Sequence, residues 1–461
     1  MEESIPRRRE EAHREGGGRD PGARFELALL SVGFVVLFFF FPHHLAGDDV
    51  ARFNDVELLR TRFATTKDPF SLAMPILSLP FDALGTVVKS PVWWVTRFNV
   101  VVVAVAVVAN YLLLRRRVEP RLLRRFFLVL LFASFFTYEL RTFNTEVADT
   151  AFIATGITLL TLGRVKSGWA LLVYAAVNTP AAVAGLAVVS AAETVRARRL
   201  RFLLPVVVAA FLIGLENWLR RGSPFTTGEE GIHGYVTEEP YSGHGGFSYP
   251  FVLGVVSILF AAGRGLLFYA PGLTLWLAGR TRQLAGACSR TALLLVLFVA
   301  GLVVAYAKWW SWNGGVSWGP RYFVIAAVPA SLALALRLGD PRRSAAADAL
   351  TLCVLAFSTW IAFAGVLASG NDAEAILCTE HGYALESFCS YSPAFSSLWY
   401  PFLGSNRQYW PSAIHHSPSI FVAVAFILVV FVYLAAGLIP GVARAGFGWI
   451  SRTVRGPGWR L

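Results

Sequence analysis

The chain has 461 residues, of which 56% are hydrophobic and only 15% are charged, and its formal net charge is +12. Soluble domains carry about 25% charged residues, so this composition argues against an ordinary soluble protein. The arginines occur in short clusters between apolar runs. That pattern is typical of loops in membrane proteins, so we expect a lipid bilayer as partner and no nucleic acid.

Solid apolar runs recur along the chain, each about as long as the roughly 20 residues that cross a bilayer. They predict an all-α, polytopic transmembrane fold. We expect spans near 26–42, 98–114, 123–138, 147–163, 201–218, 265–280, 291–309, 321–338, 346–369 and 418–437. A further apolar stretch at 164–196 is interrupted at Asn178 and Pro180, and its basic ends predict a short helical hairpin. The total is about 10–12 membrane segments.

The arginine clusters fall on one side of these spans, and the positive-inside rule makes that side the cytoplasm. We therefore expect an integral protein of the plasma (inner) membrane. It would have a disordered cytoplasmic tail at 1–23, a transmembrane domain at 24–440 and a basic cytoplasmic tail at 441–461. Short helices and most of the remaining acids would lie on the extracytoplasmic face, in outer loops 43–97, 139–146, 219–264, 310–320 and 370–417.

The first outer loop begins with two adjacent carboxylates, Asp48 and Asp49, soon after an apolar span. Carboxylates at this depth are costly unless they are hydrated or paired. Two interpretations remain open. The pair is either a solvated helix end, or it contains a general base whose pKa is raised by partial burial.

The second outer loop contains Glu139, Arg141 and Glu146 between two apolar spans. An internal ion pair that holds two helix ends together would explain these residues, Glu139 above all. The functional alternative is that Glu146 is a second carboxylate, which faces the first across a cleft.

The third outer loop contains His233 and His244 in a glycine-rich stretch that is typical of a loop. The two histidines have no third residue at metal-ligand spacing. A divalent metal ion is therefore not supported by ligand spacing, and we predict no cofactor with certainty.

The fourth outer loop is a tight turn, and four of its residues would suit a sugar: Trp310, Trp312, Asn313 and Trp318. Lys308 and Arg321 flank the turn. An interfacial aromatic belt explains one or two tryptophans, but it explains neither the glycines nor the flanking cations. Aromatic faces beside cations suit a sugar ring and an anionic lipid phosphate. Since no acid is adjacent in sequence, we expect an anion between Lys308 and Arg321.

The fifth outer loop contains Cys378 and Cys389 on the oxidising side of the membrane. We predict a structural disulfide between them. The chain has four cysteines and no Cys-x-x-Cys pair, so a zinc site is not expected.

Four sequence motifs point to one family. They are Asp49 with Arg52 and Phe53; Arg141 to Glu146; Gly222 to Gly228 with Gly263 to Pro271; and Trp312 to Arg321. With these motifs the chain resembles the GT-C superfamily of membrane glycosyltransferases, which use polyprenyl-phosphate sugars. The superfamily includes protein O-mannosyltransferases and lipid A aminoarabinose transferases. Its members often carry Asp-Glu where this chain has Asp48-Asp49, which leaves open which acid acts.

The resemblance implies a GT-C-like fold and a hexosyl- or pentosyltransferase of the cell envelope, such as one in cell-wall glycan biosynthesis. Sugar would pass from a polyprenyl-phosphate donor to a hydroxyl of a glycan, lipid or protein, with inversion, on the outer side of the membrane. Asp49, or Asp48, would be the general base, and we expect the donor phosphate to bind Lys308, Arg321, Arg141 and Arg264. We expect the sugar or acceptor to contact Trp310, Trp312, Asn313, Trp318, His233 and His244. Two alternatives are a transporter or lipid flippase, which predicts charges in mid-span, and a lipid-binding scaffold without catalysis.

Overall fold

The computed structural model describes residues 21–234, 236, 241–315, 317–367, 386–399 and 417–443. Every regular element in these ranges is a helix, so the all-α class is confirmed. The tails predicted at 1–23 and 441–461 lie almost entirely outside the described residues. Within the described ranges, α2 already begins at Pro21.

The helices with more than ten residues are α2 (Pro21–Val35), α3 (Asp48–Arg62), α4 (Ala73–Val87), α6 (Phe98–Leu114), α7 (Pro120–Phe132), α9 (Thr145–Thr161), α10 (Val165–Asn178), α11 (Ala182–Ala197), α12 (Leu204–Arg221), α16 (Ser289–Tyr306), α17 (Ala327–Leu338), α18 (Ala345–Leu367) and α22 (Pro418–Ala436). The shorter elements are η1 (Val36–Phe40), α5 (Pro91–Val95), α8 (Phe136–Glu139), η2 (Leu200–Leu203), α13 (Phe251–Phe260), α14 (Leu266–Tyr269), η3 (Pro271–Leu277), α15 (Gly279–Ala285), η4 (Gly286–Cys288), η5 (Arg321–Ala326), α20 (Glu386–Tyr391) and η7 (Pro393–Phe395).

Seven helical stretches among the described residues are long and apolar enough to cross a membrane, judged by length and composition. They are Gly22–Phe40, Pro91–Leu114, Leu200–Arg221, Gly279–Tyr306, Arg321–Leu338, Ala345–Leu367 and Pro418–Ala436. Large hydrophobic side chains are exposed on their outer faces, for example Phe211 on α12 and Phe421 on α22. Such surfaces are expected against lipid. The chain is therefore a multi-pass membrane protein.

Two details of the predicted span list can be compared directly with the structure. The stretch at 164–196 forms a helical hairpin, in which α10 and α11 are joined through residues 179–181. The span predicted at 265–280 is wrong, because this stretch contains α14, η3 and the start of α15 instead of one helix. Pro271 lacks a backbone N–H and ends α14, which explains the interruption.

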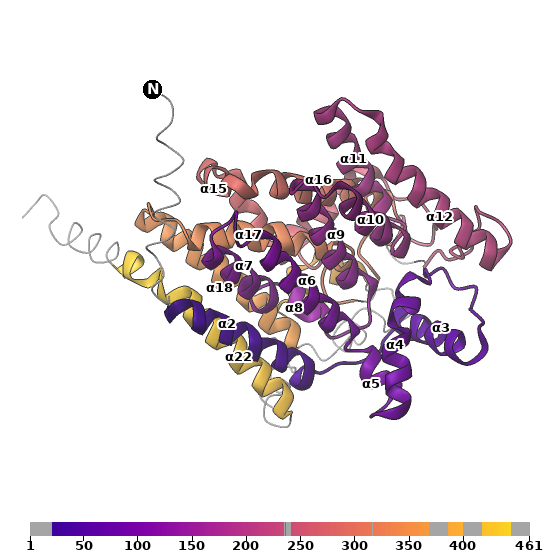
Figure 1. Ribbon diagram of the computed structural model, residues 1–461, viewed down its shortest axis with the longest axis horizontal. Helices are drawn as coiled ribbons and strands as arrows, with labels where there is room; N and C mark the ends of the chain where they lie inside the picture. The colour runs from indigo at the N-terminus through magenta and orange to yellow at the C-terminus, as the bar shows by residue number, and fades with distance from the viewer. Residues whose placement is uncertain are drawn as a thin grey trace, which may run out of the picture.

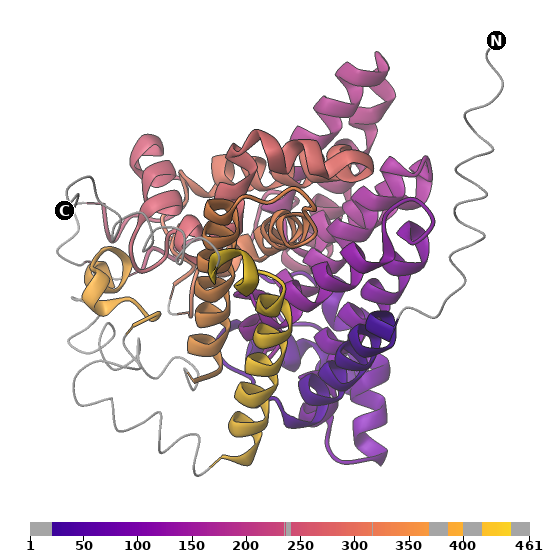
Figure 2. The same cartoon turned by 90° about the vertical axis from the view of Figure 1, so that its left-hand side faces the viewer.

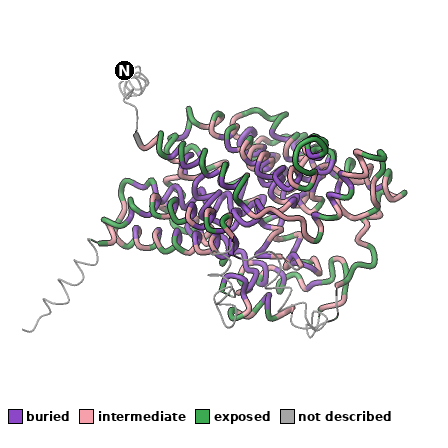
Figure 3. Tube along the Cα trace, turned by 90° about the horizontal axis from the view of Figure 1, so that it is seen from below, coloured by how far each residue is buried: buried purple, intermediate pink, exposed green. Residues whose placement is uncertain are grey.

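The helices form a bundle, and the elements of the first predicted outer loop gather at one of its ends. In Figure 1, α3, α4 and α5 gather at the right-hand end, and α15 lies toward the opposite end. Figure 2 shows α22 alongside α18, two helices that also contact each other. The buried residues fill the centre of the bundle, while the exposed ones line its periphery (Figure 3). The bundle thus provides a rigid frame for the outer elements.

Buried ion pairs fasten the bundle at the end opposite the outer loops. Glu26 on α2 accepts from Arg124 on α7 at 2.6 Å. Asp340, just beyond α17, pairs with Arg280 on α15 at 2.5 Å. Because a lone charge at membrane depth is costly, each acid needs its arginine here.

Cysteine labelling tests whether these two ends lie on opposite sides of the membrane. Arg62→Cys at the end of α3 and Arg116→Cys after α6 both replace exposed residues. We expect a membrane-impermeant maleimide to label Arg62→Cys on intact cells and Arg116→Cys only after permeabilisation. The parent chain, with its own cysteines, gives the background. Labelling of both variants on intact cells would contradict the topology.

Candidate active site

The helix α3 presents the acid pair at its first turn. Gly47 precedes it with φ of +54°, a conformation that residues with a side chain rarely adopt. The partial positive charge of a helix N-terminus stabilises carboxylates at this position. The two acids form ion pairs with different arginines. Asp48 Oδ2 lies 2.9 Å from Arg321 Nη2, and Asp49 Oδ1 lies 3.4 Å from Arg52 Nη1.

The two carboxyl groups therefore differ in acidity. Burial raises the pKa of Asp49 to about 7, and Arg52 opposes this effect while Glu146 adds to it. Burial acts on Asp48 in the same sense, but Arg321 and Arg52 outweigh it and lower the pKa of Asp48. At neutral pH Asp48 remains an anion, whereas Asp49 can both accept and release a proton. A general base needs the second property.

Two further acids surround Asp49. Glu146 lies in the first turn of α9, which is capped by Asn144. Asn144 Nδ2 also donates to Glu139 Oε2 at 2.7 Å, so Glu139 has an amide partner where the sequence suggested a cation. Burial, then Glu146, raises the pKa of Glu139 to about 8. Glu146 raises the pKa values of both Asp49 and Glu139, so it lies within electrostatic reach of them, and its role as a second carboxylate stays a prediction.

Arg141 binds backbone carbonyls on two other segments. Its Nε donates to the Pro42 carbonyl at 3.1 Å, and its Nη1 donates to the Gly365 carbonyl at 3.0 Å. The guanidinium also lies 5.3 Å from the ring centroid of Tyr138. These contacts fasten the second outer loop to the first span and to α18.

Arg264 and Asn313 shape the tryptophan turn from inside. Arg264 donates to the carbonyls of Gly315 at 2.9 Å and Gly319 at 3.0 Å, and also to the Ser317 carbonyl. The side-chain oxygen of Asn313 accepts from the Gly315 N–H at 3.0 Å. Both side chains therefore hold the turn in shape.

The three predicted sugar-binding tryptophans differ in exposure. Trp312 is 4% exposed and lies between the rings of Tyr249 and Tyr391. Trp318 is 2% exposed and packs between two other tyrosines. Trp310 is partly exposed, and its indole N–H has no hydrogen-bond partner among the described residues. Of the three rings, Trp310 is the only one that is not classed as buried, although its indole N–H, like that of Trp318, is itself buried.

Arg321 connects the turn to α3. A side chain on Gly314, whose φ is +86°, would lie 3.1 Å from Arg321 Cγ, so glycine allows the arginine to pass. Although no acid is adjacent to Arg321 in sequence, Asp48 on α3 forms an ion pair with it, and the anion expected between Lys308 and Arg321 stays a prediction. The Nε of Arg321 is nevertheless buried and has no partner among the described residues. Lys308 is exposed and forms no ion pair among the described residues.

The remaining predicted residues do not meet at this site. His233 and His244 are exposed. Within the ranges that the structure describes, no group of three or more histidine, cysteine, aspartate or glutamate residues could hold a metal ion. The buried Cys389 is disulfide-bonded, and Cys378, its predicted partner, lies outside the described residues.

Sequence reasoning missed two neighbours of the acid pair. Tyr322 stacks on Tyr306 with ring centroids 4.2 Å apart, and the Arg321 guanidinium lies 5.2 Å from the Tyr322 ring. Its position next to Arg321 in the tryptophan motif was a usable signal. Glu229 lies near enough to Asp48 that burial and then that carboxylate raise its pKa. No motif marked it.

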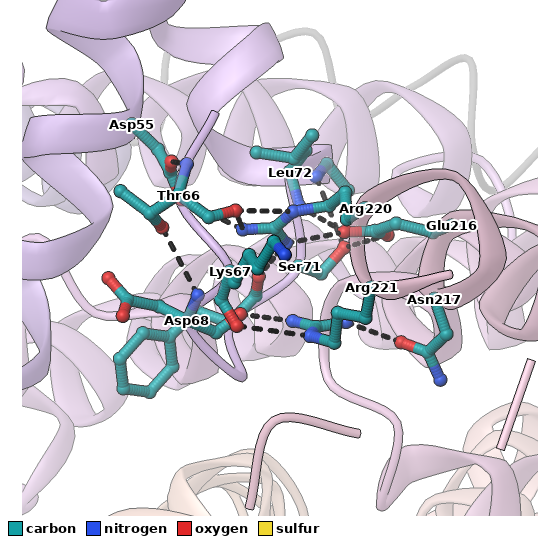
Figure 4. A network of polar contacts seen from close by, with 12 residues as sticks. Asp55, Thr66, Lys67, Asp68, Ser71, Leu72, Glu216, Asn217, Arg220 and Arg221 are labelled. Atoms are coloured by element: carbon teal, nitrogen blue, oxygen red, sulfur yellow. Dashed lines mark hydrogen bonds and ion pairs between the residues drawn. The ribbon is translucent and has the colours of Figure 1, made fainter. Parts of the chain in front are cut away.

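A dense polar network holds α3 in place from the side of α12 (Figure 4). Arg220 near the end of α12 pairs with Asp55 on α3 at 3.2 Å and donates to the Thr66 carbonyl at 2.9 Å. Glu216 accepts from the Leu72 N–H at 2.8 Å. The segment 64–72 between α3 and α4 is thus bound at several backbone groups.

The same segment supports the acid pair. The backbone carbonyl of Phe70 accepts a hydrogen bond from Arg220. The guanidinium of Arg52 lies over the Phe70 ring, 4.3 Å from the ring centroid. Arg52 in turn contacts Asp49. The network therefore connects the end of α12 to Asp49 through Phe70 and Arg52.

Comparisons with known proteins give little further guidance. No family model matches the chain, and no curated protein does. Among solved structures, the chain is similar to the crystal structure of ArnT from Cupriavidus metallidurans bound to undecaprenyl phosphate. The sequence identity is 16%, the match covers 90% of this chain and 77% of that chain, and the TM-score is 0.49. A likeness at this level carries no argument about function, which rests on the chain's own residues.

The network around Arg220 predicts a large loss of stability in Arg220→Gln. Its side chain and that of Asp55 are almost completely buried, so the substitution leaves an uncompensated carboxylate. We expect a destabilisation of about 3 kcal/mol, measured by thermal or chemical unfolding in detergent. Arg62→Gln, on the exposed end of α3, should change stability little. Equal stability of both variants would contradict the role of the network.

Proposed function

We propose that the chain is a membrane glycosyltransferase of the GT-C type, which moves a sugar from a polyprenyl-phosphate donor to an acceptor hydroxyl at the outer face. The observation that carries this proposal is the difference in acidity between the carboxyl groups of Asp48 and Asp49. One is held as an anion by Arg321, and the other titrates near neutral pH in a nearly buried place. The resemblance of the four sequence motifs to the GT-C superfamily supports the same reaction.

In the proposed reaction, Asp49 takes the proton of the acceptor hydroxyl. The hydroxyl oxygen then forms a bond to the anomeric carbon of the sugar, and the bond from that carbon to the phosphate oxygen breaks. The electron pair remains on the leaving phosphate, and the configuration inverts. This phosphate is already anionic, so it requires electrostatic stabilisation and no proton.

Arg321 and Lys308 are the cations that fit the leaving phosphate. Arg321 keeps its buried Nε available while Asp48 fixes the rest of the guanidinium. Lys308 is exposed on the same turn. Arg141 and Arg264 direct donors to backbone carbonyls, so we assign them to the support of the site.

The distribution of acids favours an enzyme over a transporter or flippase. A transporter is expected to carry its key charges near the middle of broken spans. Here Asp49 lies in the first turn of α3, Glu139 ends the short helix α8, and Glu146 lies in the first turn of α9. These acids therefore lie at helix ends and not in the middle of a broken span.

Substitution of the base tests the catalytic assignment. We expect Asp49→Asn to lower kcat by about 10²–10⁴-fold, because a general base contributes this much, with little change in donor affinity. Asp68→Asn in the same outer segment is the matched control and should remain active. Full activity of Asp49→Asn in a transfer assay with a polyprenyl-phosphate sugar would place the base elsewhere.

The raised pKa of Asp49 predicts the pH dependence of transfer. Since the base must be deprotonated, activity should rise with pH through a midpoint of about 7. Asp48→Asn removes a charge that raises this pKa, so the midpoint should move to lower pH. A midpoint that stays the same in Asp48→Asn, or moves upward, would contradict the electrostatic coupling of the two acids.

Arg321→Lys tests the phosphate site. Lysine keeps the charge but loses the fork of donors that binds Asp48 and a phosphate together. We expect the Kd for a polyprenyl-phosphate sugar to rise about tenfold. Arg342→Lys, at an exposed position beyond α17, is the control. An unchanged Kd in Arg321→Lys would remove this residue from the site.

A further inference from the structure

A second feature of the bundle lies away from the acid pair, between α6, α7, α9, α16 and α17. The structure has a cavity of about 80 Å³ there. Its wall includes Val103, Ala106, Leu130, Ala154, Leu295 and Val328, which come from all five helices. A cavity needs only about 10–15 Å³ to hold one water-sized group, so this one has room for several such groups.

The wall of this cavity favours a hydrocarbon over water. Its polar side chains already have partners within the protein. Asn110 donates to Thr155, Thr158 donates to a carbonyl in its own helix, and Thr291 bonds Thr161. Of the hydroxyls in the wall, that of Thr150 has no partner among the described residues. A site with so few open polar groups does not hold ordered water well.

One end of the cavity adjoins a cluster of cations. Leu114, the last residue of α6, lines the cavity and is followed directly by Arg115, Arg116 and Arg117. All three arginines are exposed, and none forms an ion pair within the described part of the chain. Leu123, near the start of α7, lines the same end. Basic clusters beside gaps between membrane helices attract anionic lipid headgroups.

The combination of apolar slot and cations selects one kind of ligand. A free phosphate ion would use the arginines and leave the slot empty, and a neutral lipid would use the slot without the arginines. We propose that this slot binds one acyl chain of an anionic glycerophospholipid, with the lipid phosphate on Arg115–Arg117. The site lies at the opposite end of α6 from the acid pair and does not depend on the proposed transferase function.

The wall of the slot extends along α6. Val103 and Leu114 both line it, and these two residues are eleven positions apart, which is about 16 Å along the helix axis. The slot therefore runs along the bundle from the arginine cluster toward the outer elements. A lipid in it would fill the space among the five helices that line the cavity.

Native mass spectrometry of the full chain tests the proposal. The purified protein is equilibrated in nanodiscs that contain equal amounts of phosphatidylglycerol and phosphatidylcholine, then released into detergent. We expect one tightly held phosphatidylglycerol per chain. Ala106→Phe fills the slot and should abolish its retention. Val105→Phe, one residue away on the lipid-facing side of α6, where Val105 is 64% exposed, should not.

The arginines have their own variant and control. Replacement of Arg115, Arg116 and Arg117 by glutamine should reduce retention about tenfold. The same replacement of Arg198, Arg199 and Arg201, which are exposed at another turn, should have no effect. Ala154→Leu on α9 is a second slot-filling variant if Ala106→Phe does not fold, and it should also lose the lipid.

Three results would overturn the proposal. They are no retained lipid in the wild-type chain, equal retention by the slot-filling and control variants, and retention of phosphatidylcholine as strong as that of phosphatidylglycerol. Added polyprenyl phosphate that displaces phosphatidylglycerol from the slot would assign the space to that lipid and would equally reject the proposal.

Discussion

The ion pair between Asp48 and Arg321 joins two outer loops that are far apart in the sequence. It brings the first turn of α3 against the tryptophan turn, and it fixes the charge of one acid so that its neighbour can differ. Two adjacent carboxylates in a partly desolvated place cannot both be stable anions without such help. Asp49 differs because burial raises its pKa and its contact with Arg52, at 3.4 Å, does not offset this effect.

Much of the surrounding structure maintains this arrangement. Arg264 and Asn313 keep the tryptophan turn in the shape that directs Arg321 to α3. Arg220 holds the segment after α3, on which Arg52 rests. Several residues that looked like ligand contacts in the sequence are therefore supports. Their chemistry is used inside the protein, where an unsatisfied carbonyl or an unpaired charge would be expensive.

The sequence predicted the all-α membrane fold, because runs of apolar residues report the bilayer directly. It also singled out Asp49, Glu146 and Arg321. It could not show that Asp48 meets Arg321, since that contact depends on how distant loops pack. The burial of Trp312 likewise depends on Tyr391, which lies far along the chain. The span predicted at 265–280 fails for a local reason, because the stretch is apolar enough but Pro271 interrupts the helix.

Donor turnover by the purified protein tests the central claim most directly. The protein would be incubated with a synthetic polyprenyl-phosphate sugar, with and without a hydroxyl acceptor, and the released polyprenyl phosphate and sugar product would be measured. The account predicts release of the lipid phosphate and a product of inverted anomeric configuration, both lost in Asp49→Asn. A purified, folded protein that binds the donor but never cleaves it, or that only moves it between leaflets, would contradict the account.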